Sequence, residues 1–405
     1  MRVKVACVGG GPAGLYLSIL LKRQDPSHDI TVHERDQEGS TYGWGVTYWR
    51  GLLDKLHTYD PESARALEEH SVRWSEGVAH VRDLATRHRG DEAFGIGRHR
   101  LLEILAGRAR SLGVRLEFAH EITDGNLPEA DLVVAADGVH SALRTRHADH
   151  FGSEIRTGRN RYIWLGTTQV FDAFTFAFVE TDHGWIWCYG YAFGPERSTC
   201  VVECAPETWS GLGLDEANEA DGLAVLEKLF ADVLDGHPLI GRSSDRADAQ
   251  WLNFRTLTNR TWHRGNLVLL GDAAHTTHYS VGAGTTLALE DAVALAGALG
   301  EHAELPRALA HYERERRSQL LSIQSAARYS AQWYENLPRY ISLPPDQMFA
   351  LLGQRHSPLL PHVPPRLYYR IDRAAGQLEA LRRFKRWLGP KVARTVHARA
   401  LASRK

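Results

Sequence analysis

The sequence has few cysteines, almost no methionine and no excess of charge of either sign. Its four cysteines (Cys7, Cys188, Cys200 and Cys204) form no Cys-x-x-Cys pair and have no histidine partners at zinc-ligand spacing, so we expect neither a disulfide framework nor a metal site. Its 48 Lys and Arg residues against 49 Asp and Glu residues give a net charge of -1, which argues against a protein that coats nucleic acid. Hydrophobic residues make up 43% of the chain, too many for a disordered protein.

Long apolar runs are also missing, because no stretch reaches the roughly 18 apolar residues that a membrane-spanning helix needs. The first 21 residues begin with a charged segment, as a signal peptide does, but several glycines interrupt them and no small-residue cleavage site follows. We therefore expect a folded, cytoplasmic protein. The chain is rich in tryptophan, with eleven Trp against two Met, and rigid flat side chains suit a site that holds something planar.

The hydrophobic pattern predicts a strand, a helix and a second strand over residues 3–8, 11–23 and 29–34. Two later stretches, 131–136 and 266–270, are continuously apolar, as expected of further strands in a buried parallel sheet. Other predicted elements are a helix over 98–112, a strand over 114–118, a helix over 214–234 and a long helix from about residue 286. Residues 162–204 differ, because they are β-rich and aromatic and predict an antiparallel sheet.

A glycine fingerprint lies at the first strand-helix turn. Gly9, Gly11 and Gly14 have Gly-x-Gly-x-x-Gly spacing, and Glu34 ends the second strand twenty residues after Gly14. The first glycine allows the tight turn, the second lets backbone approach a pyrophosphate at the helix N-terminus, and the third allows close packing, while Glu34 can accept a ribose hydroxyl. The fingerprint predicts dinucleotide binding, with Pro12, Ala13 and Arg35 as further contacts.

Two further segments decide which dinucleotide is expected. Asp137-Gly138 follows one buried strand, and Gly271-Asp272 follows another and leads to Gly282-Ala283-Gly284-Thr285-Thr286. Over residues 1–330 the chain resembles the single-component (group A) flavoprotein aromatic hydroxylases of the para-hydroxybenzoate hydroxylase superfamily. The resemblance implies bound FAD, with Asp272 on its ribityl or ribose hydroxyls and the helix after Gly284 directed at the flavin. Further expected FAD contacts are Arg98, Asp137, Gly282, Thr285 and Thr286, with an ordinary surface charge as the less favoured alternative for Arg98.

The chain departs from the family pattern at His278-Tyr279, where most members have consecutive prolines, and at Thr286, where Asn is usual. These residues, with Trp44-Gly45-Val46, resemble a smaller branch that hydroxylates aryl-CoA thioesters such as salicyloyl-CoA and 2-aminobenzoyl-CoA, and that contains a tryptophan hydroxylase of the violacein pathway.

The same departure supplies the expected catalytic residues, His278 and Tyr279. His278 could bond the substrate's hydroxyl or amino group or assist proton transfer near neutral pH, or it could be structural and fill the space that proline leaves. The expected substrate contacts are Trp44, Tyr48, Trp164, Trp187, Arg159 and Arg161.

The predicted fold class is α/β: a Rossmann-like FAD-binding domain interleaved with a β-sheet substrate lobe, plus C-terminal helices. We expect the FAD-binding domain at 1–155 and 263–330, with 45–95 contributing to the substrate side, the β-rich lobe at 156–262, and a helical basic region at 331–405. Residues 366–405 hold twelve Lys and Arg against two acids, which could meet the phosphates of a CoA thioester, an anionic membrane or only solvent.

The resemblance implies that NADH or NADPH reduces FAD as a transient co-substrate, and that O2 then forms a flavin C4a-hydroperoxide that an electron-rich aromatic ring attacks. The most favoured substrate is an aryl-CoA thioester, with 5-hydroxylation of salicyloyl-CoA as the example and a free aromatic amino acid or tryptophan-derived metabolite as the alternative. A flavin-dependent halogenase is disfavoured, because such enzymes use a lysine to carry the oxidant and this chain has none between Lys55 and Lys228. A non-catalytic flavin-binding protein remains open at this stage.

Overall fold

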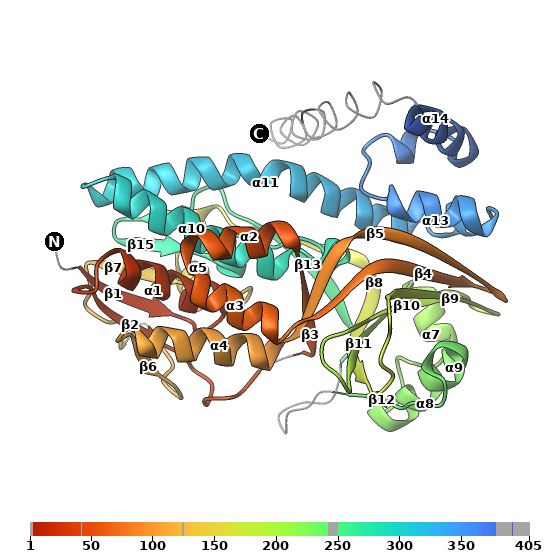
Figure 1. Cartoon of the computed structure of the whole chain (residues 1–405), viewed down its shortest axis with the longest axis horizontal. Helices are drawn as coiled ribbons and strands as arrows, with labels where there is room; N and C mark the ends of the chain where they lie inside the picture. Colours follow the sequence, from red (N-terminus) through yellow and green to blue (C-terminus); the bar gives the residue numbers. More distant parts are fainter. Residues whose placement is uncertain (1–2, 42, 124, 242–249, 378–390, 392–405) are drawn as a thin grey trace.

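The computed structural model describes residues 3–41, 43–123, 125–241, 250–377 and 391 of the chain. It contains two β-sheets side by side, with helices packed around the first sheet and a long helix running past both (Figure 1). Much of the basic segment that begins near Arg366 lies outside the described residues. Within the described residues, no helix combines the length and apolar character needed to cross a membrane.

The first sheet has the strand order β14-β15-β7-β1-β2-β6 and is parallel except for the edge strand β14. Its strands are β1 (Lys4–Val8), β2 (Asp29–His33), β6 (Arg115–Glu117), β7 (Leu132–Ala135), β14 (His263–Arg264) and β15 (Leu267–Leu269). The predicted strands at 3–8, 29–34, 114–118, 131–136 and 266–270 are therefore confirmed, each within a residue or two of its bounds. Val133 and Val134 of β7 are buried, which is why this strand reads as a continuous apolar run.

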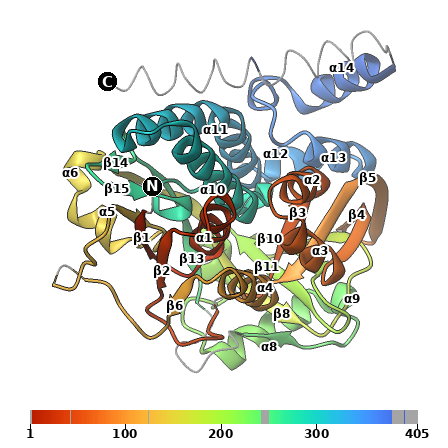
Figure 2. The ribbon, with the colours of Figure 1, turned by 60° about the vertical axis from the view of Figure 1, so that its left-hand side comes forward.

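The helices of this half are α1 (Pro12–Gln24), α2 (Arg50–Tyr59), α3 (Pro61–Glu69), α4 (Arg98–Ser111), α5 (Ala142–Arg146), α6 (Ala148–Phe151) and α10 (Gly284–Glu301). Helix α1 packs against both α4 and α10 (Figure 2). Leu15, Leu17 and Ile19 of α1 are almost fully buried, and each such side chain contributes about 2 kcal/mol by leaving water. These contacts fix α1 and α10 over the sheet.

The second sheet has nine strands, in the order β12-β8-β11-β10-β9-β4-β5-β3, with β13 also paired to β8. Its strands are β3 (Gly45–Trp49), β4 (Val72–Val81), β5 (Leu84–Gly97), β8 (Glu154–Thr167), β9 (Phe174–Thr181), β10 (Gly184–Ala192), β11 (Ser198–Cys204), β12 (Leu239–Ile240) and β13 (Leu252–Thr258). The expected antiparallel sheet is correct for β8 to β11, but β4 pairs with β9 in parallel, so the sheet as a whole is mixed. The strands of residues 45–97 thus belong to the same sheet as the strands of residues 154–258.

The two faces of the second sheet have different packing partners. Ile186 and Cys188 of β10 belong to a core with the helices α7 (Pro206–Gly211), α8 (Glu219–Leu229) and α9 (Ala231–Leu234) on one side. Trp187 and Tyr189, which alternate with them, lie on the other face in an aromatic layer that also receives α11 (Leu305–Glu335), α12 (Pro338–Ile341) and α13 (Pro345–Gly353). The predicted helix over 214–234 was too long, because residues 214–218 precede α8 and Phe230 separates α8 from α9.

Helix α11 (Leu305–Glu335) spans 31 residues and passes from the first sheet to the second (Figure 1). It is followed by α12 (Pro338–Ile341), α13 (Pro345–Gly353) and α14 (Pro365–Gln377). Short 3-10 turns lie before α10, at η1 (Gly271–Ala273) and η2 (Tyr279–Val281), and between α13 and α14, at η3 (Leu360–His362). Within the described residues the region after Ala331 is helical, and Pro338, Pro345 and Pro365 each lie at the start of a helix.

A fully buried carboxylate joins α10, α11 and the turn after β15. Asp291 accepts hydrogen bonds from His275 Nε2 at 2.8 Å, from Arg316 Nε at 2.7 Å and from the Gly271 backbone N–H at 3.2 Å. Burial raises the pKa of Asp291, but the charges of His275 and Arg316 outweigh it and hold the pKa below its usual value. The carboxylate is therefore ionised at neutral pH and loses its stabilising effect only in strong acid.

We expect Asp291→Asn to lower the free energy of unfolding by about 3 kcal/mol, because the change leaves the buried Arg316 with only its longer contact to Glu290, at 3.5 Å, to offset its charge. Urea unfolding of the FAD-free protein at pH 7 measures the effect. Glu180→Gln is the matched control, since its ion pair with Arg82 is half exposed and contributes less than about 1 kcal/mol. Equal losses in the two variants would contradict the assignment.

Candidate functional site

The turn between β1 and α1 accepts only glycine at two of its positions. Gly9 has φ +111°, and a Cβ there would lie 2.2 Å from the Ala136 carbonyl oxygen. A Cβ on Gly14 would lie 2.3 Å from the Gly9 carbonyl oxygen, so glycine at this position lets α1 approach β1. Both glycines are thus required by close backbone packing.

Gly11 meets a different requirement. It is the N-cap of α1, and among the described residues no atom lies within 4 Å of where its Cβ would be. Pro12 and Ala13 open the helix, and no described side chain caps it. Free backbone N–H groups at such an end attract anions, so the space in front of Gly11 fits the pyrophosphate of a dinucleotide.

Glu34 lies beside this turn, where its carboxylate accepts the Gly10 N–H at 2.8 Å and the Asp36 N–H at 2.9 Å. The expected contact Arg35 is exposed, and its side chain forms an ion pair with Asp36 at 3.9 Å. The structure therefore brings Glu34, but not the charged end of Arg35, to the glycine turn.

Asp137 has a structural task that the sequence did not reveal. Its Oδ2 accepts the Ala142 N–H at the start of α5 at 2.9 Å, while Oδ1 is buried and has no partner among the described residues. Asp137 is not among the residues that line the large cavity described next, although Val139 and His140 are. Its contact with the cofactor stays a prediction.

A cavity of about 1180 Å³ lies between the second sheet and the N-terminus of α10. This volume exceeds that of a pocket for one drug-sized molecule, so there is room for a flavin ring and an aromatic substrate together. One end is formed by Gly271, Asp272, Arg98 and the segment 282–285. The other end is aromatic and includes Trp74, Tyr162, Trp164, Phe176, Tyr189 and Tyr191.

Asp272 and Arg98 supply opposite charges at the first end. The surrounding protein desolvates Asp272 and so raises its pKa, and the charge of Arg98 opposes that rise. The Asp272 side chain is nevertheless accessible from the cavity. Burial likewise lowers the pKa of Arg98, and its Nε has no hydrogen-bond partner among the described residues. Arg98 is therefore not a solvated surface charge, and a bound polar group would satisfy it.

Helix α10 points its N-terminus into the same cavity. Gly282 has φ +61° and ends the 3-10 turn, and a Cβ on Gly284 would meet no described atom within 4 Å. No described side chain caps this helix end, and Thr285 lines the cavity while the buried Thr286 Oγ1 has no described partner. A helix N-terminus of this kind stabilises the negative charge that a reduced flavin carries.

The two expected catalytic residues face different surroundings. His278 is not among the cavity-lining residues, and its Nδ1 caps η2 by accepting the Ser280 N–H at 3.3 Å and pairing with Ser280 Oγ at 2.8 Å. Burial lowers the pKa of His278 to about 3, so this imidazole does not change charge near neutral pH. This arrangement favours the structural reading of His278 over proton transfer. Tyr279 does line the cavity.

The expected substrate residues divide into two groups. Trp164 and Arg161 line the cavity, and the Arg161 guanidinium lies 4.7 Å from the Trp209 ring centre. Trp44, Tyr48, Trp187 and Arg159 do not line it. Tyr48 packs on Phe94 and Trp187 stacks on Tyr334 in the core, while Arg159 is exposed and pairs with Glu207.

Glu203 is a site residue that the sequence analysis missed. It is buried in β11, and its carboxylate accepts hydrogen bonds from Tyr279 and Asn160 directly behind the cavity wall. The available signal was an acid within an otherwise apolar strand, Thr199 to Cys204.

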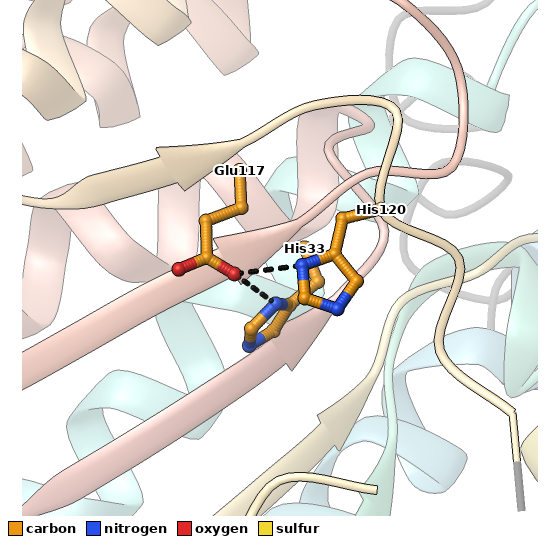
Figure 3. A group of neighbouring side chains, drawn as sticks. All are labelled: His33, Glu117 and His120. Carbon is orange, nitrogen blue, oxygen red and sulfur yellow. Dashed lines mark ion pairs between the residues drawn. The ribbon is translucent and has the colours of Figure 1, made fainter. Parts of the chain in front are cut away.

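A second cluster of titratable side chains lies at the carboxyl ends of β2 and β6 (Figure 3). The Nδ1 atoms of His33 and His120 both lie 2.9 Å from one oxygen of Glu117. Two imidazoles and a carboxylate are metal-ligand types, but ion pairing to the shared oxygen accounts for this arrangement without an ion. We assign it no metal.

Two helix N-termini without described side-chain caps, together with the buried Arg98, fit the anionic and polar groups of one bound dinucleotide. With an aromatic cavity beside the second of these ends, the fold defines a flavin-dependent oxidoreductase for a planar substrate.

Comparison with known proteins agrees. A family model described as "FAD binding domain" matches residues 2–323. A salicyloyl-CoA 5-hydroxylase from a Streptomyces species is 40% identical over 349 residues, which are 84% of this chain and 66% of that protein. A 3-hydroxy-4-methyl-anthranilyl-[aryl-carrier protein] 5-monooxygenase from Streptosporangium sibiricum is 37% identical over 84% of this chain and 90% of its own length.

The chain spans about two thirds of the first relative and most of the second. Among solved structures, 2-methyl-3-hydroxypyridine-5-carboxylic acid oxygenase has a TM-score of 0.66 at 20% identity, covering 84% of this chain and 93% of that one, which shows the shared fold. The protein belongs to the FAD-binding family of flavoprotein aromatic monooxygenases, as the Asp-Gly and Gly-Asp segments predicted. Its cofactor is FAD, and NADH or NADPH serves as the reductant typical of this class.

The open space at Gly11 gives a test of cofactor binding. We expect Gly11→Ala to weaken FAD binding about tenfold without changing the stability of the FAD-free protein, because the new methyl group meets no protein atom but occupies the space for the pyrophosphate. Flavin fluorescence titration and urea unfolding measure the two effects. Gly107→Ala on α4, also in open space, is the matched control and should bind FAD normally.

Proposed function

We propose that the protein hydroxylates the ring of an aryl-CoA thioester, with 5-hydroxylation of salicyloyl-CoA as the leading case. The observation that carries the proposal is the aromatic end of the cavity, which directly adjoins the N-terminus of α10. Flat apolar walls bind a benzene ring and exclude water, which an oxygen-transfer reaction requires. The 40% identical relative, a salicyloyl-CoA 5-hydroxylase, supports the substrate class.

The protein residues have separable tasks in this reaction. FAD, when bound at the glycine turn and beside Asp272 and Arg98, supplies the redox chemistry that activates O2. The N-terminus of α10 stabilises negative charge at that end of the cavity. Tyr162, Trp164 and Tyr189 hold the substrate ring, so that one edge of it faces the reacting centre.

The thioester arm needs a polar exit, and the paired strands β8 and β13 offer one. Arg255 and Thr157 lie opposite each other on these strands, are exposed, and line the cavity. Arg161 lies on the same ribbon, where it bonds Asn253 Oδ1. We place the CoA arm along this rim, because arginine side chains bind the phosphates that CoA carries.

An aromatic ring attached to a carrier protein is the second candidate, because the relative from Streptosporangium sibiricum acts on such a thioester. Both substrates present the same thioester to the cavity and differ only outside it. A free aromatic amino acid or tryptophan-derived metabolite is a further alternative, and it would leave the rim unused.

We expect salicyloyl-CoA to stimulate NADH or NADPH oxidation at least tenfold and to yield a product one oxygen atom heavier. The measurement uses FAD-loaded protein, absorbance of the nicotinamide and mass spectrometry, with 2-aminobenzoyl-CoA, salicylate, tryptophan and a carrier-protein thioester as comparators. Stimulation by salicylate or tryptophan alone would overturn the thioester assignment, and stimulation without oxygenated product would argue against a hydroxylase.

We expect Arg255→Gln to raise the KM for salicyloyl-CoA about five- to tenfold with little change in kcat, since the lost contact lies far along the substrate from the ring. A short thioester that lacks the nucleotide, salicyloyl-N-acetylcysteamine, should show no such change. Arg159→Gln is the matched control, because Arg159 is exposed but does not line the cavity. Truncation after Ala331 is unsuitable as a test, because Trp333 and Tyr334 belong to the core.

A further inference from the structure

Glu203 is an acid on the cavity side of the aromatic sheet. It lies in β11 opposite Trp187 of β10 and Tyr162 of β8, and only 1% of it is exposed. Because alternate residues of a strand share a face, Glu203 lies on the same side as Val201, which lines the cavity. A carboxylate among aromatic rings is costly to bury unless hydrogen-bond donors satisfy it.

Two donors satisfy it. Asn160 Nδ2 donates to Glu203 Oε1 at 2.7 Å, and the Tyr279 hydroxyl donates to Oε2 at 2.5 Å. Glu203 itself does not line the cavity, whereas Tyr279 does. The acid therefore acts on the cavity only through Tyr279.

The direction of this bond determines what Tyr279 can offer a ligand. A phenol has one O–H group to donate, and here Tyr279 donates it to Glu203. The Tyr279 oxygen therefore has only lone pairs left for other partners. Its ring is fixed by Tyr162 at 4.6 Å and Phe254 at 5.6 Å between ring centres. A fixed hydrogen-bond acceptor thus stands in the wall at the aromatic end of the cavity.

We propose that Glu203 is a positioning residue that makes Tyr279 a hydrogen-bond acceptor for the hydroxyl or amino group of the aromatic substrate. The inference rests on the proposed function and adds a basis for choosing among aromatic rings. Accepting a hydrogen bond from such a substituent increases the electron density of the ring, which favours its attack on an electrophilic oxygen. A ring without a donor leaves the buried Tyr279 oxygen unsatisfied and binds less well.

The electrostatic surroundings agree with this role. Burial raises the pKa of Glu203 to about 7, the bonds from Tyr279 and Asn160 lower it, and the Glu335 charge of α11 raises it. Burial and the Glu203 charge raise the pKa of Tyr279, so it keeps its proton. Among the described residues, the other ionisable groups near the pair are His278, whose ring centre lies 4.3 Å from that of Tyr279, Tyr162 of β8, Tyr189 of β10, Tyr334 of α11 and Arg355.

The protonation state of Glu203 determines how the hydrogen bond to Tyr279 changes with pH. Above pH 7 Glu203 is ionised and accepts the hydrogen bond that the Tyr279 hydroxyl donates. As the pH falls through about 7, Glu203 gains a proton that it can donate to Tyr279, which reverses the bond and turns the Tyr279 proton toward the cavity. The preference for donor-bearing rings should therefore be lost in acid.

The test compares dissociation constants of 2-aminobenzoyl-CoA and benzoyl-CoA for the FAD-loaded protein without reductant. These ligands share the CoA arm and differ by one amino group, so their ratio isolates the contact at the ring. We expect wild-type protein at about pH 8 to prefer 2-aminobenzoyl-CoA about tenfold, which corresponds to one hydrogen bond of about 1.4 kcal/mol. Tyr279→Phe and Glu203→Gln should reduce the ratio toward one, with the benzoyl-CoA affinity unchanged as the measure of intact folding.

The ratio in wild-type protein should also fall between about pH 8.5 and 5.5, and it should stay flat in Glu203→Gln, because the glutamine does not titrate. A ratio that survives Tyr279→Phe, or that keeps its pH dependence in Glu203→Gln, overturns the proposal. Equal binding of both thioesters overturns the inference but leaves the proposed function intact. Failure of both thioesters to bind overturns the inference and the proposed function together.

Discussion

The hydrogen bonds to the Asp291 carboxylate hold the parts of the site in register. This one buried acid connects the Gly271 backbone after β15 with α10 and, through Arg316, with α11. Asp272 follows Gly271 directly, and the N-terminus of α10 begins two turns before Asp291, so the acidic and the helical ends of the cofactor site share one anchor. Since both partners of Asp291 are buried, the anchor is shielded from solvent and from salt.

A second constraint comes from the alternation of side chains along the second sheet. One face packs against α7, α8 and α9 with small and aliphatic groups, and the other presents aromatic rings to the cavity and to α11. Glu203 occupies a position on the aromatic face where a neutral side chain would be simpler to bury. Two dedicated donors satisfy Glu203 there, which agrees with the proposed contact between Tyr279 and the ligand.

The sequence alone predicted the positions of those parts of the candidate site that depend on local backbone geometry. The glycine turn, Glu34 and the Gly-Asp segment lie within single strand-turn-helix units, so spacing alone placed them correctly. The sequence did not predict that Tyr48, Trp187 and Arg159 lie outside the cavity lining. The direction in which an aromatic or charged side chain points depends on how distant strands pair. The strands β3, β4 and β5 illustrate the difficulty, since they join a sheet whose other members follow some sixty residues later. The sequence left two readings of His278 open for a related reason: its ring turns to Ser280, two residues away, and no spacing rule predicts that orientation.

Helix α11 carries a geometric consequence of its own. Arg316 contacts Asp291 beside the first sheet, and Trp333 and Tyr334 pack in the aromatic layer of the second, so two faces of one helix must point in set directions. An α-helix turns about 100° and advances about 1.5 Å per residue. Inserting one residue between these contacts would rotate one face a quarter-turn away from its partner, and inserting four would nearly restore the angle but displace it by about 6 Å. The number of residues between Arg316 and Trp333 is therefore as tightly constrained as their identity.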